Sequence, residues 1–252
     1  MKAGKILFAR LAIAGTLLCA WQAMSASGLF YRDVVPPIER VLYAFADLLA
    51  SQAFWGNLEV TGLEIAGAVA IGGLAGLCFG ILIGGNRFLS RAYEPLLHYL
   101  GPTPKIIFFP VLIMWFGVGG GSKIAMGALS AFFPVALSAA AGMRQIDPVL
   151  IRVGRSFGAS AWQMAVKVIL PAMRAPILNG IRLGFGIAVI GTLLAETKLS
   201  NKGLGFLIIQ SYIQFDMPRL YAMLCAVFAL SALANALLNT AADWHAGRSR
   251  GT

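Results

Sequence analysis

The chain has 252 residues, of which 59% are hydrophobic and only 12% charged, and its mean hydropathy is +0.79. Soluble globular domains carry about 25% charged residues, and a core of this size cannot hide so much apolar surface. The composition therefore excludes a disordered chain and disfavours a soluble enzyme. It indicates an all-α membrane protein, because spans of about 20 residues leave room for about six transmembrane helices.

The chain carries 20 Lys and Arg residues against 10 Asp and Glu residues, which gives a net charge of +10. A soluble protein with this excess would be a candidate for nucleic-acid binding. Here the cations are spread along the chain, and no basic run holds interleaved aromatic residues. Because Lys and Arg gather in the cytoplasmic loops of membrane proteins, we attribute the excess to topology and predict no nucleic-acid partner.

The N-terminal apolar run covers residues 6–24 and follows two lysines. A cleaved signal peptide is the alternative, because small residues after the run offer a cleavage site. The run is long for a signal peptide and favours a retained helix that begins in the cytoplasm. A more polar stretch follows, in which Pro36-Pro37 precedes an amphipathic helix predicted over 38–50 on the outer surface.

The second and third predicted spans both carry unusual residues. The second, at about 60–85, has glycine at every fourth position from Gly72 to Gly84, which favours close packing against another helix. The third, at about 93–116, is interrupted at 101–104 by Gly-Pro-Thr-Pro. Proline inside a helix removes a hydrogen bond, and broken backbone at membrane depth is tolerated only where protein or a watery cavity covers it.

The last three spans are predicted at about 124–143, 176–194 and 220–241. The turn at 117–123 resembles a phosphate loop only superficially, because it ends Gly-Ser-Lys, and we predict no nucleotide site there. An outer segment, 196–218, contains a short apolar piece at 206–213. The distribution of Lys and Arg predicts that both termini and the segment 144–174 lie in the cytoplasm. A single transmembrane domain, 1–252, is expected.

Segment 144–174 is amphipathic rather than merely polar. Its apolar spacing predicts one helix before Gly158 and a second after it, which Leu170-Pro171 closes. Glycine lets the backbone turn between the two helices, and Trp162 is expected to pack inside them. From these residues alone, a compact knob that docks on a partner protein and an interfacial helix that lies on membrane lipid are equally favoured.

The residues around Gly158 resemble the EAA loop of bacterial ABC importer permeases. That motif reads Glu-Ala-Ala, three residues, Gly, nine residues and Ile-x-Leu-Pro, and Val168-Ile169-Leu170-Pro171 falls in register with Gly158. The triplet then maps to Arg152-Val153-Gly154, so that Arg152 stands where the family has Glu. The segments 110–117 and 203–208 resemble the nitrate/sulfonate/taurine subfamily. The likeness covers nearly the whole chain, with 57–245 as the permease core.

The resemblance implies a type I ABC importer permease in the bacterial cytoplasmic (inner) membrane, which transports a small, anionic solute and is not itself an enzyme. It implies an ATP-binding subunit in two copies, which carries the ATP and Mg, so this chain is expected to bind no cofactor. It further implies a periplasmic or lipid-anchored substrate-binding protein and a second permease subunit, for which a homodimer is favoured over a sister permease. The residues expected to dock the ATP-binding subunit are Arg152, Val153, Gly154, Arg155, Ser156, Phe157, Gly158, Ala159, Ser160, Ala161, Trp162, Leu170 and Pro171.

Ionisable residues inside spans are functional candidates, because charge is costly to bury in a bilayer. Lys105, Glu64 and Glu196 are therefore the candidates for the translocation path. Each has an alternative: Lys105 reaches toward an interface, Glu64 sits at the outer interface, and Glu196 forms a surface pair with Lys198 or Lys202.

Two other functions were weighed against the permease. A membrane-embedded enzyme needs a nucleophile–base pair or a metal cluster, and His98 and His245 stand apart, so no catalytic or metal-binding residue is predicted. A secondary transporter or channel that works without an ATPase is the main alternative. It would be expected to show repeated halves or paired broken helices, whereas this sequence has one predicted break.

Overall fold

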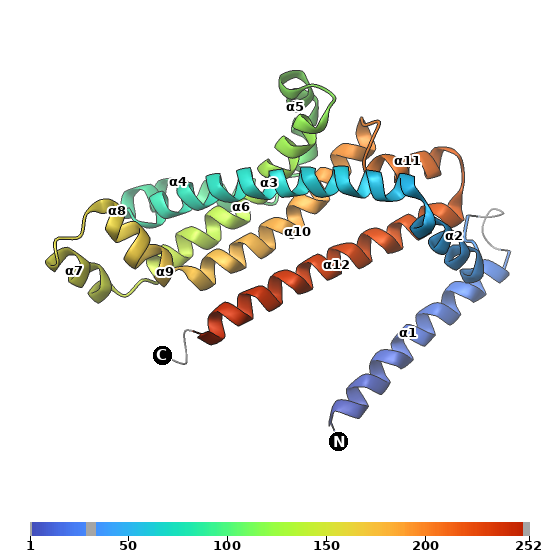
Figure 1. Cartoon of the computed structure of the whole chain (residues 1–252), viewed down its shortest axis with the longest axis horizontal. Coiled ribbons are helices and arrows are strands. Elements are labelled where there is room, and N and C mark those ends of the chain that lie inside the picture. The colour runs from blue at the N-terminus through green and yellow to red at the C-terminus, as the bar shows by residue number, and fades with distance from the viewer. Residues whose placement is uncertain (1, 29–33, 249–252) are drawn as a thin grey trace.

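The computed structural model describes residues 2–28 and 34–248, and every regular element in those ranges is helical. Figure 1 shows an elongated bundle in which α3, α6 and α10 run side by side, with α12 along one flank. Within the described part of the chain, four helices are long and apolar enough to cross a membrane: α3 (Gln52–Gly84), α6 (Gly120–Arg144), α10 (Arg174–Lys198) and α12 (Met217–Arg248). The predicted all-helical membrane protein is confirmed, with four such helices, or five if the bent pair described next is one span.

The predicted third span is a pair of helices that meet almost at a right angle. α4 (Arg87–Leu100) and the stretch formed by a 3₁₀ turn (Lys105–Phe108) and α5 (Phe109–Phe116) are bent by 92°. The predicted break at 101–104 is therefore present, and it is much sharper than a proline kink within one helix. In Figure 1, α5 rises out of the bundle while α4 lies along it.

The centre of the bundle is the contact between α3 and α6, and glycine makes it possible. A Cβ atom at Gly76 would lie 2.7 Å from the carbonyl oxygen of Phe132, which is closer than real Cβ atoms approach. Gly72, Gly80 and Gly84 face the α6 backbone in the same way. The predicted packing role of this glycine face is confirmed, and α10 packs against both α6 and α3.

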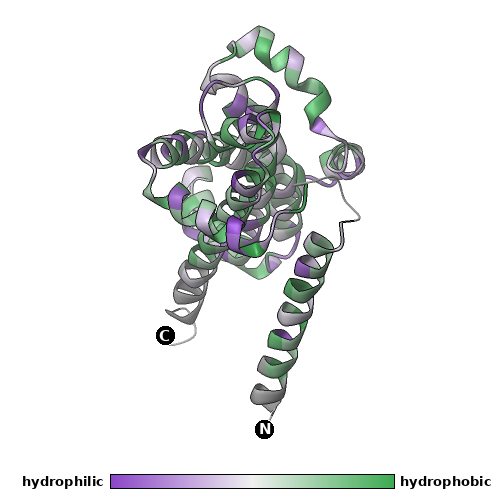
Figure 2. Cartoon of the chain, turned by 90° about the vertical axis from the view of Figure 1, so that its right-hand side faces the viewer, coloured by the Kyte–Doolittle hydropathy of each residue, from purple (hydrophilic) through white to green (hydrophobic). Residues whose placement is uncertain are grey.

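The N-terminal helices lie at the edge of this bundle. α2 (Ile38–Ala50) has the predicted bounds, whereas α1 (Lys2–Ala26) stands apart from the bundle in Figures 1 and 2. The C-terminal part of α1 is attached through Trp21, whose ring meets that of Tyr221 edge-on with centroids 4.9 Å apart. The Trp21 indole also donates a hydrogen bond of 3.0 Å to the Pro36 carbonyl oxygen.

The spanning helices extend beyond the predicted apolar runs. α3 begins at Gln52 rather than near 60, α6 at Gly120 rather than near 124, and α12 continues past 241. The physical reason is that the predicted bounds followed apolar residues, whereas helical hydrogen bonds continue into polar turns outside the apolar band. The short apolar piece predicted at 206–213 is present as α11 (Leu204–Ile213).

Candidate functional site

Segment 144–174 folds into the predicted pair of short helices at one end of the bundle (Figure 1). α7 (Pro148–Ser156) begins after Asp147, whose side chain accepts a hydrogen bond of 2.8 Å from the Val149 amide. α8 (Ala161–Met164) begins with a capping box, in which Ser160 and Gln163 each bind the other's backbone amide. Such caps supply acceptors for the amides that a helix start leaves unpaired.

The turn between these helices depends on two glycines. Gly158 has a φ of +69°, which L side chains rarely adopt, so the predicted glycine turn is confirmed. Gly154 lies where α7 crosses the next helix, and a Cβ atom there would lie 2.7 Å from the terminal carbon of Met164. The first glycine sets the direction of the turn, and the second sets how closely the two helices pack.

The second helix ends one residue beyond the Leu170-Pro171 pair that was predicted to close it. α8 continues through a π-helical turn (Ala165–Ile169) into α9 (Leu170–Ala172), and the chain bends only at Met173 before α10 begins. Pro171 lies in the first turn of α9, where its missing amide is tolerated, and the wider π turn separates it from α8. Met173 is fully buried against the end of α6, near Gly142.

The segment presents large apolar side chains that no described part of this chain covers. Phe157 is 85% exposed and Trp162 is 76% exposed, so the expectation that Trp162 packs inside the knob is wrong. Val149, Leu150 and Val153 are about half exposed on α7, and the Arg152 and Arg155 side chains are exposed as well. Large apolar side chains at a polar surface mark a binding surface for protein or membrane.

An ion pair that the sequence analysis missed ties the start of this segment to α4. The two terminal nitrogens of Arg144 donate to the two carboxylate oxygens of Glu94 at 2.6 and 2.7 Å. Such a two-pronged pair fixes orientation as well as distance. The two residues are 50 positions apart, and no local pattern links them.

At the opposite end of the bundle, Glu196 is fully buried. Its carboxylate accepts hydrogen bonds of 2.7 Å from the Thr61 hydroxyl and 2.6 Å from the Gly205 amide. A surface pair of Glu196 with Lys198 or Lys202 is therefore wrong, because both lysines are exposed while Glu196 points into the bundle. The carboxylate lies inward because α11 folds back over the end of α10 and supplies a backbone donor.

Glu64 and Lys123 complete this cluster. Lys123 is only 1% exposed, donates hydrogen bonds to the carbonyl oxygens of Val118 and Gly119, and interacts electrostatically with Glu64 and Glu196. Glu64 is 6% exposed, and one of its carboxylate oxygens has no hydrogen-bond partner. Lys123 was predicted to lie in a turn, because the glycine-rich stretch before it obscures the start of α6 in the sequence.

Lys105 lies apart from these interactions, at the break between α4 and α5. Its ammonium donates hydrogen bonds to the carbonyl oxygens of Gly101 and Thr103, and it lies 4.9 Å from the centroid of the Phe133 ring. The structure thus brings Glu64 and Glu196 together, whereas Lys105 binds the carbonyl oxygens of the break between α4 and α5. Their part in a translocation path stays a prediction.

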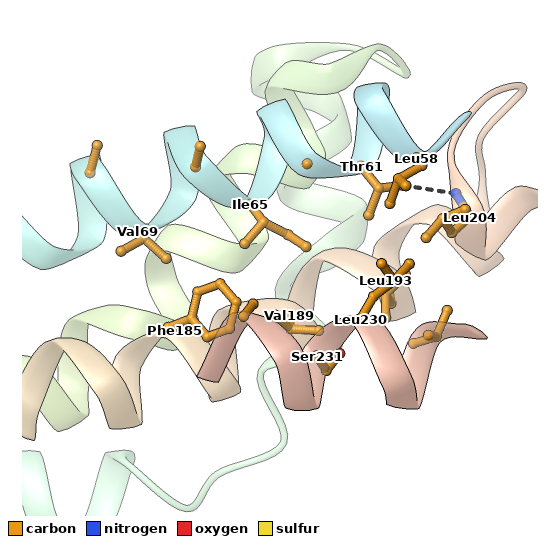
Figure 3. A pocket seen from close by; sticks show the side chains of 15 residues that line it. Leu58, Thr61, Ile65, Val69, Phe185, Val189, Leu193, Leu204, Leu230 and Ser231 are labelled. Atoms are coloured by element: carbon orange, nitrogen blue, oxygen red, sulfur yellow. Dashed lines mark hydrogen bonds between the residues drawn. The ribbon is translucent and has the colours of Figure 1, made fainter. Parts of the chain in front are cut away.

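A cavity of about 510 Å³ opens between α3, α10 and α12, next to the α11 N-terminus (Figure 3). Its lining is apolar apart from Thr61 and Ser231, and the Thr61 hydroxyl is already bonded to Glu196 and to the Leu204 amide. A polar solute would lose its bonds to water here without replacement, which is costly. The cavity therefore suits an apolar occupant better than an anionic one.

Comparisons with known proteins agree with this architecture. Residues 76–251 match the family described as binding-protein-dependent transport system inner membrane component. The putative aliphatic sulfonates transport permease protein SsuC of Bacillus subtilis (strain 168) is 33% identical over 80% of this chain and 73% of its own length. The taurine transport system permease protein TauC of Escherichia coli (strain K12) is 31% identical over 91% of this chain and 86% of its own.

A solved structure shows the same fold. It is the MetNI methionine ABC transporter in inward-facing conformations, which matches with a TM-score of 0.59 and 22% sequence identity over 78% of this chain and 93% of that one. The family match covers more than half of the chain and includes the whole of segment 144–174. The chain therefore belongs to the binding-protein-dependent transport system inner membrane components, the permease subunits of ABC importers.

Proposed function

We propose that this chain is the permease subunit of an ATP-driven importer for a small anionic solute of the sulfonate or taurine type. The solute class is supported by the names of two relatives, which are permeases for aliphatic sulfonates and for taurine. ATP drives the cycle from a separate ATP-binding subunit, present in two copies, and a substrate-binding protein delivers the solute. Two copies of this chain form the translocation path between them.

The observation that carries this proposal is the exposed apolar surface of segment 144–174. Phe157 and Trp162 project from a knob that Gly158, Gly154 and the capped helix starts hold in shape. Exposed aromatic side chains such as these bury well in a cleft of a partner protein, where they are the main anchors of the interface. The knob is the docking surface for the ATP-binding subunit. Closure of the two ATP-binding subunits on ATP moves the knobs, and the knobs move the helices.

Arg152 gives this docking surface an unusual charge. It is exposed beside Arg155, where the family motif has Glu. A partner surface that meets both guanidinium groups must be neutral or acidic to avoid like-charge repulsion. The matching ATP-binding subunit should therefore present a neutral or acidic surface opposite α7.

The topology of the proposal has six spans in the bacterial cytoplasmic membrane. The four long helices and the bent pair supply five, and α1 supplies the sixth. α1 has 25 residues, about 37 Å of helix, which exceeds a hydrocarbon core of about 30 Å. Its exposed apolar side chains, including Phe8 and Leu17, suit a lipid environment. Both termini and segment 144–174 lie in the cytoplasm, where the arginines of α4, α7 and the start of α10 gather.

Reconstitution tests the proposal directly. The chain, its ATP-binding subunit and its substrate-binding protein are incorporated into liposomes, and taurine, ethanesulfonate and nitrate serve as probe solutes. The proposal predicts uptake of at least one probe only when ATP and the binding protein are both supplied. Uptake by the chain alone, driven by a solute or ion gradient, would instead establish the secondary transporter.

A further inference from the structure

The N-terminus of α11 is capped by side chains from other helices. A helix start leaves its first amides without partners inside the helix. Here the Gly203 amide donates to Asn57 at 2.6 Å, the Leu204 amide to Thr61 at 2.8 Å, and the Gly205 amide to Glu196 at 2.6 Å. These three consecutive amides are bound by α3 and α10, so α11 is fastened to both.

The N-terminus of α11 packs closely against α10. A Cβ atom at Gly205 would lie 2.6 Å from the Leu193 carbonyl oxygen, and a Cβ atom at Gly203 would strike the Glu196 carboxylate. Gly203 also has a φ of +102°, a conformation that favours glycine. Thr61 is the centre of the arrangement, because its one hydroxyl accepts from α11 and donates to α10 (Figure 3 draws the bond to Leu204).

α10 connects this fastening to segment 144–174. It begins at Arg174, directly after the buried Met173, and ends at Lys198, two residues beyond Glu196. Its 25 residues form a rod of about 37 Å. Only residues 199–203 separate α10 from α11. α10 thus forms a continuous helical connection between segment 144–174 and Glu196, and Glu196 connects it to α11.

We propose that Thr61 is a positioning residue that, with Glu196, fastens α11 to α3 and α10, so that ATP-driven displacement of segment 144–174 moves α11 as the outer gate. The inference rests on the proposed function, because it requires an ATP-binding subunit at segment 144–174. α11 lies at the end of the bundle opposite segment 144–174, and its ten residues are too few to span a bilayer, which takes about 20. Lys123, from α6, is buried beside this arrangement and attracts the Glu196 carboxylate electrostatically.

The test follows α11 directly and needs no identified solute. Cys19, Cys78 and Cys225 are exposed and are first replaced by Ser, and a reporter cysteine is placed at Ile213, an exposed α11 residue. The complex with its ATP-binding subunit is studied in liposomes with a membrane-impermeant maleimide as probe. The labelling rate is compared without nucleotide and after trapping with ATP and vanadate. We expect the labelling rate at Ile213 to change on trapping. Thr61→Val should reduce that change about tenfold, because a tenfold effect is of the size expected for the loss of one charge-assisted hydrogen bond.

The chain offers a matched control. Thr192 on α10 is also fully buried, but its hydroxyl has no hydrogen-bond partner among the residues that the structure describes. Thr192→Val should leave the ATP-dependent change in the labelling rate at Ile213 intact. Thr61→Ser, which keeps the hydroxyl, should retain this change as well. Asn57→Ala removes the cap of Gly203 at a half-buried position and should reproduce the loss. ATP hydrolysis should be similar in all four variants, whereas a general folding defect would lower it.

Three results distinguish a failure of the inference about Thr61 from a failure of α11 as the gate and from a failure of the proposed function. A full ATP-dependent change in Thr61→Val and Asn57→Ala overturns the inference, as does an equal loss in Thr192→Val. An unchanged labelling rate at Ile213 in an unmodified complex that hydrolyses ATP shows that α11 is not the gate. Absence of any ATP-binding subunit from the unmodified complex would contradict the proposed function itself.

Discussion

Arg144 and Glu94 form a two-pronged ion pair, with both nitrogen–oxygen distances below 3 Å, at the point where α6 ends and segment 144–174 begins. The pair holds the last residue of α6 against α4, the first arm of the bent pair. Asp147, which caps α7, follows three residues later. The orientation of the exposed apolar surface of segment 144–174 is thus set from one side by this ion pair and from the other by the buried Met173.

The first prediction concerns the strength of this pair. The Arg144 side chain is 42% exposed and that of Glu94 is 19% exposed, so water screens their attraction in part. Arg144→Met and Glu94→Gln should each lower the free energy of unfolding, and their effects should not add, with a coupling energy of about 1 kcal/mol. Thermal unfolding of the single and double variants in detergent measures this. Fully additive effects would show that the pair contributes nothing.

The second prediction concerns the α3–α6 contact and compares two neighbouring glycines. Gly76 faces the α6 backbone, whereas a Cβ atom at Gly73 would meet no atom within 4 Å. Gly76→Ala should destabilise the bundle by about 1–3 kcal/mol, because the helices must move apart. Gly73→Ala should be neutral or stabilising, because alanine favours the helix. Denaturation followed by circular dichroism compares the two. Equal effects of both substitutions would contradict the close-packing account.

Local patterns predicted the parts of the fold that local chemistry determines. Pro36-Pro37 and an amphipathic spacing gave the bounds of α2, and Gly-Pro-Thr-Pro gave the break before Lys105. Glycines at a spacing of four gave the packed face of α3. Each of these signals acts within about two helical turns, so one stretch of sequence is enough to predict it.

Long-range partners were not predictable in this way. Glu64 and Glu196 were each selected because charge inside a span is costly, but their contact joins helices 132 positions apart. Lys123 was missed because the glycines before it read as a turn, whereas Gly120 and Gly121 form the first turn of α6. The exposure of Trp162 was missed because a large apolar residue is ordinarily expected inside, whereas this side chain is 76% exposed.

The third prediction concerns the buried cation. Lys123→Met leaves the carboxyl groups of Glu64 and Glu196 without their facing ammonium inside the bundle. Leaving a buried polar group uncompensated costs about 1–3 kcal/mol, so Lys123→Met should lower the free energy of unfolding by about that amount. The matched control, Lys202→Met, changes an exposed lysine and should be neutral. Adding Glu64→Gln to Lys123→Met should recover part of the loss, since one carboxylate is removed. Thermal unfolding compares them, and a stable Lys123→Met variant would contradict the role of the cluster.

The fourth prediction concerns the turn inside segment 144–174. Gly158→Leu places a side chain at a φ of +69°, although no atom lies within 4 Å of the new Cβ position. The strain of about 1–3 kcal/mol is therefore relieved by turning α8 away from α7 rather than by unfolding the bundle. We expect normal membrane insertion and lost ATP-dependent uptake. Gly186→Leu, at an outward-facing helical glycine with open space, is the control. Normal uptake in Gly158→Leu would exclude docking through this turn.

Recovery of the ATP-binding subunit with the tagged chain after mild detergent extraction tests the central claim most directly. The paired variant Phe157→Ala/Trp162→Ala removes the two exposed rings of the knob, and Phe88→Ala/Trp115→Ala removes two similarly exposed rings outside it. The account predicts that the unmodified chain and the control pair retain a stoichiometric ATP-binding subunit, while the knob variant loses it without losing thermal stability. Retention of that subunit by the knob variant, or its absence from the unmodified chain, would contradict the account.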